Sequence, residues 1–155
     1  MIRVQQADFD MNQEYQALIS DNSSSGAVVM FVGRVRDVNQ GHQIDELYLE
    51  HYPEMTNKYL SQLERQARAL WPLENVSVIH RVGPLQLEDK IVLVGVSSVH
   101  REAAFEAAQY LMDLLKTNAP FWKKEVIEGG HNRWVEANHK DTIAAAQWAE
   151  VERLA

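Results

Sequence analysis

Apolar runs alternate with polar breaks along the chain, and their spacing predicts interleaved strands and helices. Ala27 to Val32 is a continuous apolar run rich in β-branched residues, which is typical of a central strand. Ile44, Leu47 and Leu49 alternate in part and predict a second strand that ends near residue 52. Further strands are predicted at 76–80, 91–96, 121–127 and 133–137.

Apolar positions three and four residues apart predict four helices. Asp10 caps the first, whose apolar positions are Tyr15, Leu18 and Ile19. The second begins at Pro53 and stops before the proline at 72. The third runs from the cap residue Ser98 to about residue 117, and the last is capped by Asp141. The inward positions expected in the third helix are Ala104, Phe105, Ala108, Leu111, Met112 and Leu115.

Turn signals separate these elements without dividing the chain. Residues 20–26 form a polar loop, residues 39–42 are predicted to form a turn or a mobile loop, and further turns are predicted at 83–84, 88–90 and 129–130. No repeat or low-complexity linker occurs, so residues 1–155 are predicted to form a single domain. Because the elements lack a regular βαβ rhythm, the predicted fold class is α+β with a mixed sheet.

Composition narrows the classes of protein. Hydrophobic residues make up 46% and charged residues 24% of the chain, as in ordinary globular domains. The net charge of −7 argues against nucleic acid and anionic membrane as partners. No apolar run is long enough to span a membrane, and the first residues lack the pattern of a secretory signal, so we expect a cytoplasmic protein. Without cysteine, any sulfur chemistry must use atoms supplied by another molecule.

The common site motifs are missing. Six scattered histidines show no metal-ligand spacing, so we predict no metal site. Gly33 and Gly83 are isolated, which leaves no phosphate loop or dinucleotide fingerprint, and no cofactor is predicted. Ser97 and Ser98 lack the flanking glycines of a nucleophile elbow.

Basic residues at the ends of elements are the remaining candidates. Arg34 and Arg36 follow a predicted strand and lie on one side of the chain, either as solvated surface residues or as an anion site. His100 and Arg101 lie in the first turn of the third helix, where cations oppose the helix dipole unless an anion is bound. This second pair therefore indicates a bound anion.

Lys116 begins a segment in which aromatic residues adjoin three lysines. At the end of the helix it either complements the helix dipole or takes part in chemistry. A lysine near other cations and apolar rings loses its proton more easily and becomes a better nucleophile or proton carrier. Arg101 and Lys116 lie about 22 Å apart along one helix. A small substrate that needs both therefore indicates a homodimer, with one residue from each copy.

Five longer segments can be compared with known families: Val29–Arg36 (VMFVGRVR), Leu49–Met55 (LEHYPEM), Ile79–Gly83 (IHRVG), Gly95–Phe105 (GVSSVHREAAF) and Leu115–Glu125. Together they resemble one family, the large, catalytic subunit of molybdopterin synthase. The resemblance extends from about residue 27 to residue 137. Several long motifs in the same order make it specific.

The resemblance implies an α/β-hammerhead fold with an additional small antiparallel β-subdomain. It also implies a homodimer within a heterotetramer, in which each copy binds a small ubiquitin-like sulfur-carrier subunit. The implied reaction is a sulfurtransferase step of molybdenum cofactor biosynthesis. Cyclic pyranopterin monophosphate, or precursor Z, gains two dithiolene sulfurs from the carrier's C-terminal glycine thiocarboxylate and becomes molybdopterin.

The resemblance also assigns roles to residues. Lys116 and Lys123 stand where the family has its catalytic lysines, and Phe31 and Met112 where it has pocket-lining residues. The implied substrate-binding residues are Arg34, Val35, Arg36, His100, Arg101, Lys116, Lys123, Lys124 and Glu125. Lys124 stands where Arg is frequent, which loses a planar fork but keeps the charge. Asn138 and His139 stand where relatives can carry a basic residue.

Two other functions stay open from the residues. One is a non-catalytic scaffold for a ubiquitin-like partner, and retention of both lysines argues against it. The other is a sensor in which the basic pocket binds a phosphate-bearing metabolite without reaction. Turnover in the presence of the carrier separates either from the enzyme.

Overall fold

The computed structural model describes all residues from 1 to 155 and contains nine strands and five helices. The strands are β1 (Ile2–Gln5), β2 (Ala27–Arg34), β3 (Val38–Asn39), β4 (His42–His51), β5 (Leu73–Arg81), β6 (Gly83–Gln86), β7 (Lys90–Ser98), β8 (Phe121–Ile127) and β9 (His131–Val135). The helices are α1 (Met11–Ile19), α2 (Pro53–Leu70), α3 (Arg101–Asn118), α4 (His139–Ala146) and α5 (Trp148–Leu154).

The main sheet has four strands in the order β1-β5-β7-β2. β1 and β5 are parallel and the other pairs are antiparallel, which confirms the predicted mixed sheet and the α+β class. The prediction that residues 27–32 form a central strand is wrong, because β2 lies at the edge. Val29 packs against the large core and Met30 against a smaller cluster on the other face. The apolar run therefore indicates that both faces of β2 are covered, and it does not indicate a central position in the sheet.

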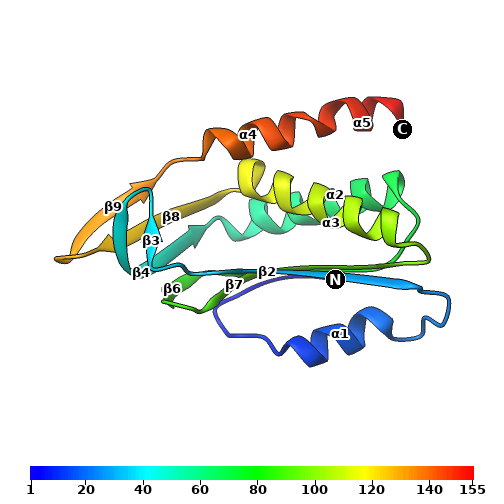
Figure 1. Ribbon diagram of the computed structural model, residues 1–155, viewed down its shortest axis with the longest axis horizontal. Coiled ribbons are helices and arrows are strands. Elements are labelled where there is room, and N and C mark those ends of the chain that lie inside the picture. The colour runs from blue at the N-terminus through cyan, green and yellow to red at the C-terminus, as the bar shows by residue number, and fades with distance from the viewer.

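Helices cover both faces of this sheet (Figure 1). α2 and α3 lie on one side, where buried valines of β5 and β7 meet Leu60, Leu63 and Leu111. α1 lies on the opposite side (Figure 1), where Phe9 packs with Ile79 and the neighbouring strand. Alternate residues of β5 and β7 thus enter two separate clusters, and both faces of these strands are apolar.

The second sheet is antiparallel and holds five strands, with β3-β4-β8-β9 in order and β6 paired to β4. It extends beyond one end of the helical layer (Figure 1). Gly83 has a φ of +80°, which suits glycine, but the predicted turn at 83–84 is wrong because Gly83 already pairs with Leu49 as the start of β6. The turn at 39–42 is confirmed: Gln40 and Gly41 both have positive φ and join β3 to β4.

Three predicted details of the helices are wrong. Ser98 belongs to β7 and its hydroxyl donates to the Pro72 carbonyl, so His100 takes the N-cap position without a side-chain bond. The cap before α4 is Asn138, which accepts from the Lys140 N–H, while Asp141 lies inside the first turn. Phe105 is exposed because it lies on the outer face of α3.

The first helix is confirmed, with Asp10 accepting from the Gln13 N–H. Its buried face differs from the predicted one, since Leu18 and Glu14 are buried while Tyr15 is exposed. Arg3 of β1 donates to the Glu14 carboxylate, which allows a charged residue to face inward there.

No helix of the structure is both long enough and apolar enough to cross a membrane. α4 and α5 run along the outside of α3 at the end of the chain (Figure 1). Trp148 of α5 donates to Asp113 and packs edge-on against Trp71 and Tyr110, which attaches the last helix to the core.

A cationic cavity at the junction of the two sheets

A cavity of about 510 Å³ opens where the C-terminal end of α3 meets the ends of the main sheet and the face of β8. Six of the residues expected at the site line it: Phe31, Arg34, Arg36, Met112, Lys116 and Lys123. These residues come from β2, the segment after it, α3 and β8, which are far apart in the sequence. The fold therefore brings four cations to one concave surface.

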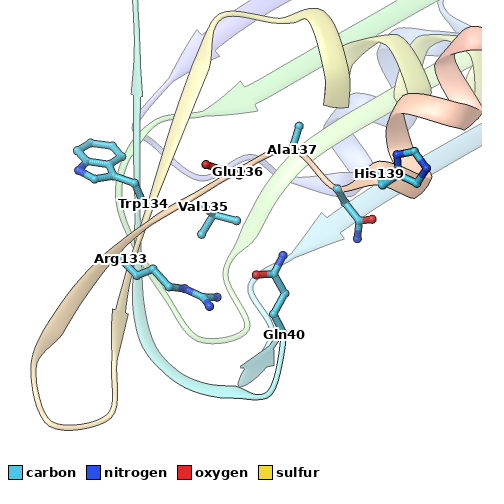
Figure 2. Close-up of a pocket in the computed structure, with 8 residues that line it drawn as sticks. Gln40, Arg133, Trp134, Val135, Glu136, Ala137 and His139 are labelled. Atoms are coloured by element: carbon cyan, nitrogen blue, oxygen red, sulfur yellow. The ribbon is translucent and has the colours of Figure 1, made fainter.

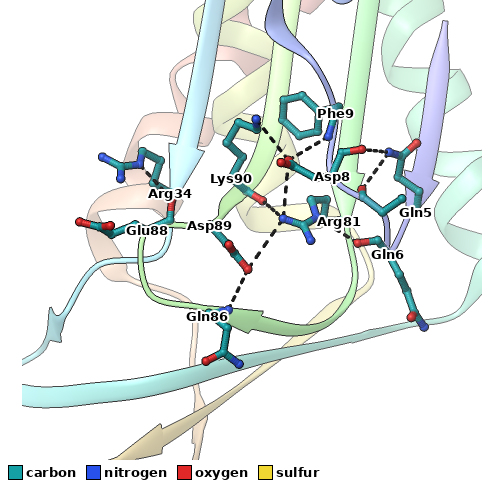
Figure 3. Close-up of polar contacts among 11 residues, drawn as sticks. Gln5, Gln6, Asp8, Phe9, Arg34, Arg81, Gln86, Glu88, Asp89 and Lys90 are labelled. Atoms are coloured by element: carbon teal, nitrogen blue, oxygen red, sulfur yellow. Dashed lines mark hydrogen bonds and ion pairs between the residues drawn. The ribbon is translucent and has the colours of Figure 1, made fainter.

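Arg34 is held at the mouth of this cavity by the turn between β6 and β7. Its Nε donates to the Glu88 carbonyl at 3.1 Å (Figure 3). Glu88 has a φ of +70°, so the turn presents its carbonyl with a backbone that L-residues seldom adopt. The remaining guanidinium donors of Arg34 have no partner in the chain and can bind an anion.

Lys116 lies in the last turn of α3, where its positive charge complements the helix dipole. Its ammonium lies 3.5 Å from the Asp141 carboxylate of α4, and the side chain is 54% exposed. This exposed pair is weak, because surface ion pairs contribute about 0–1 kcal/mol. A substrate anion can therefore replace Asp141 at little cost.

Lys123 lies on the face of β8 that borders the cavity. Desolvation lowers the pKa of its ammonium, and the nearby charges of Lys116 and Arg36 lower it further. The Glu125 carboxylate, 3.8 Å away, opposes that shift. A lysine with a lowered pKa exchanges its proton more readily near neutral pH, as acid–base chemistry requires.

Glu125 is 1% exposed and lies beside Lys123 of the cavity lining. Its carboxylate accepts from Arg133 Nη2 at 2.8 Å and from the Asn39 side chain, besides its contact with Lys123. Burial of a carboxylate is tolerated here because it is paired and hydrogen-bonded. Glu125 holds Lys123 and the β8–β9 pair in place and does not itself line the cavity.

Four other expected substrate-binding residues lie outside this cavity. Val35 packs with Leu47, and the β6–β7 turn uses both its backbone groups. Lys124 points to the opposite face of β8, with its ammonium 5.0 Å from the Tyr48 ring centroid. His100 and Arg101 lie at the far end of α3 from Lys116, as the spacing along one helix predicted.

Sequence reasoning missed His80, whose alternation with Val76 and Val78 indicated only a strand. The structure places this imidazole in the cavity wall, stacked on the ring of Phe121 with centroids 3.8 Å apart. Burial lowers the pKa of His80 to about 4, so the ring is neutral at neutral pH. The packing of His80 of β5 against Phe121 of β8 could not be inferred from the local pattern.

A second cavity, of about 410 Å³, adjoins the first and shares the segment after β9 with it. Gln40 and residues 133–139 line it, as Figure 2 shows. Arg133 is its single Lys or Arg, and Glu125 already binds that guanidinium. Asn138 lines both cavities, whereas His139 lines only this second one. The candidate chemistry therefore belongs to the larger cavity.

No group of three or more histidine, cysteine, aspartate or glutamate side chains is arranged to hold a metal ion. The larger cavity contains cations on rigid elements and a lysine with a lowered pKa. Together with the α+β fold, these features suit an enzyme that binds an anionic substrate beside lysine side chains.

Comparison with known proteins then gives the family. Residues 4–118 match the family model described as MoaE protein. A relative from Haemophilus influenzae, named molybdopterin synthase catalytic subunit, is 53% identical, and the match covers 95% of this chain and 97% of that protein. The chain belongs to the MoaE family.

Solved structures agree with this assignment. A molybdopterin biosynthesis MoaE protein from Burkholderia ambifaria matches with a TM-score of 0.82 and 44% identity, covering 96% of this chain and 97% of that one. A molybdopterin synthase structure from Staphylococcus aureus matches with a TM-score of 0.79 and 35% identity, covering 86% and 95%. The mixed sheet with a separate antiparallel sheet is thus the architecture of the family.

Proposed function

We propose that this chain is the catalytic subunit of a molybdopterin synthase and transfers sulfur to a pterin phosphate. The observation that carries this proposal is the meeting of Lys116 and Lys123 with Arg34 and Arg36 in one cavity. Relatives at about half identity over nearly the whole chain bear that enzyme's name. The substrate is cyclic pyranopterin monophosphate, and the product is molybdopterin.

Each cation has a task that its position allows. Arg34 and Arg36 bind the substrate phosphate, for which guanidinium donors are well suited. Lys116 orients the thiocarboxylate sulfur for attack on the pterin, since its ammonium is exposed and only weakly paired. Lys123 moves a proton or stabilises developing charge, because burial and the neighbouring cations lower its pKa.

The sulfur donor is the C-terminal thiocarboxylate of a small ubiquitin-like carrier subunit. A chain without cysteine needs such a donor, because it has no thiol of its own to hold sulfur. The carrier's extended tail enters beside the two lysines and gains affinity through main-chain hydrogen bonds. Removal of the carrier's last two residues therefore abolishes transfer.

A homodimer within a heterotetramer explains the second cationic group. His100 and Arg101 lie about 22 Å along α3 from Lys116, so they reach a phosphate in the partner's cavity and not in their own. Mixing Lys116→Ala chains with Arg101→Ala chains tests this. Half of the sites in each mixed dimer regain both residues, and activity recovers to about a quarter of the unmodified level. Two inactive variants that stay inactive after mixing would contradict the shared site.

The decisive test is reconstitution. The purified chain is incubated with precursor Z and thiocarboxylated carrier, and molybdopterin is measured as its fluorescent oxidised derivative. Product that depends on both reagents is expected. A folded chain that binds the carrier but forms no product would favour the scaffold function. Immunoblotting of cell fractions checks the cytoplasmic location that we also propose.

A further inference from the structure

We propose that His80 contacts the substrate directly: its neutral imidazole accepts, through Nε2, a hydrogen bond from an N–H or O–H group of the bound pterin. This inference rests on the proposed function and assigns a role to a side chain that the lysine and arginine chemistry leaves unused. Three observations carry it: the ring's place in the cavity wall, its fixed tautomer, and the excess of cations among the charged groups of the lining.

The first observation is position. His80 is the last but one residue of β5 and faces the same side of the sheet as Val78. Phe121 stacks on its ring at 3.8 Å with an interplanar angle of 16°, and Phe121 lies two residues before Lys123 on the same face of β8. His80 is 6% exposed, and that remaining surface belongs to the cavity lining.

The second observation is the tautomer. Nδ1 lies 2.8 Å from the Arg81 carbonyl oxygen, which can only accept, so Nδ1 carries the hydrogen. In a neutral imidazole Nε2 then holds a lone pair and acts as an acceptor. No hydrogen bond to Nε2 occurs within the chain, and this atom is not among the fully buried polar atoms that lack a partner, so it is accessible from the cavity that His80 lines. A donor group that enters the cavity can therefore form a hydrogen bond with this lone pair.

The third observation is that the charged side chains of the cavity are mostly cations, which favour acceptors. Its neutral acceptors are His80 and the side chains of Asn39, Gln40, Thr117 and Asn138. Arg34, Arg36, Lys116 and Lys123 can only donate, which suits a phosphate but offers nothing to the N–H groups of a reduced pterin ring. The two carboxylates of the lining are Asp141, which pairs with Lys116, and Glu136. A neutral acceptor binds an N–H without repelling the phosphate or drawing a cation away from it.

A purely structural role leaves part of this arrangement unused. Stacking on Phe121 needs only a flat ring, and the bond to the Arg81 carbonyl needs only Nδ1–H. His51 offers a natural control, since it stacks on Phe121 with centroids 6.0 Å apart but does not line the cavity. The two histidines differ in access to substrate while sharing the same aromatic partner.

The test compares His80→Phe with His51→Phe in the complete enzyme with its thiocarboxylated carrier. Phenylalanine keeps the flat ring and removes the acceptor. We expect His80→Phe to raise KM for precursor Z about 5- to 10-fold, as loss of one hydrogen bond predicts, with a smaller change in kcat. His51→Phe should change KM less than about twofold. A folded His80→Phe enzyme with unchanged KM would overturn the proposal.

A measurement on the unmodified chain avoids any folding defect of the variant. With ¹⁵N-labelled histidine, the His80 signals should report Nδ1–H and a bare Nε2, and saturation with precursor Z should shift the Nε2 resonance as it gains a hydrogen bond. An unchanged Nε2 resonance at saturation contradicts the contact even if the enzyme turns over. Failure of the proposed function is distinct, since it is absence of molybdopterin from the unmodified enzyme.

Discussion

The two sheets of this protein differ in how their faces are covered. In the main sheet, Leu93, Val94 and Val96 of β7 are fully buried, with successive side chains packed on opposite faces. In the second sheet, β8 alternates, with Lys123 toward the cavity and the exposed Trp122 on the other face. A sheet covered on both faces supplies stability, whereas a half-covered sheet can hold charges beside solvent. The site lies where the two meet.

Removing a cavity lysine should have the largest effect on function with little effect on stability. Lys123→Ala and Lys116→Ala are each expected to lower turnover by about 10²- to 10⁴-fold, since each removes a charge that acts on the reacting groups. Molybdopterin formation measures this, and circular dichroism checks the fold. Full activity in a folded Lys116→Ala chain would refute the assigned role.

Truncating a buried side chain of the main core should lower stability strongly and change function little. Leu111 is fully buried between α3 and the main sheet, so Leu111→Ala is expected to lower the free energy of unfolding by about 3 kcal/mol. Urea unfolding measures the loss. Activity per folded molecule should stay close to the unmodified level. A loss of kcat that exceeds the loss of folded protein would mean that the two regions are coupled.

Acid should weaken the junction through His80. Burial lowers its pKa to about 4, below the usual 6.5, so the unfolded chain binds the proton first as pH falls. The stabilisation is therefore complete above pH 6.5 and is lost between about pH 6.5 and 4, by up to about 3 kcal/mol. Urea unfolding of the chain and of His80→Phe at pH 7 and 4.5 measures this. If the free energy of unfolding depends equally on pH in both chains, His80 is not the cause of the acid sensitivity. Burial also lowers the pKa of His51, but this residue is present in both chains and contributes equally to both.

The smallest effect is expected on the outer face of β8. Lys124 lies over the rings of Tyr48 and Trp134, away from the cavity. Lys124→Ala should change turnover less than about threefold and cost about 0.5–1 kcal/mol of stability through the lost cation–π contacts. Steady-state kinetics of Lys124→Ala and Lys123→Ala, measured side by side, compares the two losses of turnover. A loss as large as that of Lys123→Ala would place Lys124 in the site of an assembled dimer.

Local patterns determined much of this protein. Hydrophobic periodicity and turn-forming residues place most strands and α2 to within a few residues. This works because burying one face of a helix or strand imposes a repeat of apolar positions that can be seen in a short stretch of sequence. The motifs around Arg34, Lys116 and Lys123 indicated the family and its chemistry. The spacing of Arg101 and Lys116 on one helix also followed from helix geometry alone.

Only the tertiary structure decided which of these residues share a cavity. β2 has the apolar run of a central strand but lies at the edge, since the run depends on what covers its faces and not on its neighbours. Val35 and Lys124 adjoin site residues in sequence yet point elsewhere, because successive strand residues alternate. His80 belongs to the site because its ring stacks on Phe121. This contact joins residues 41 positions apart in the sequence, so no local pattern contains it.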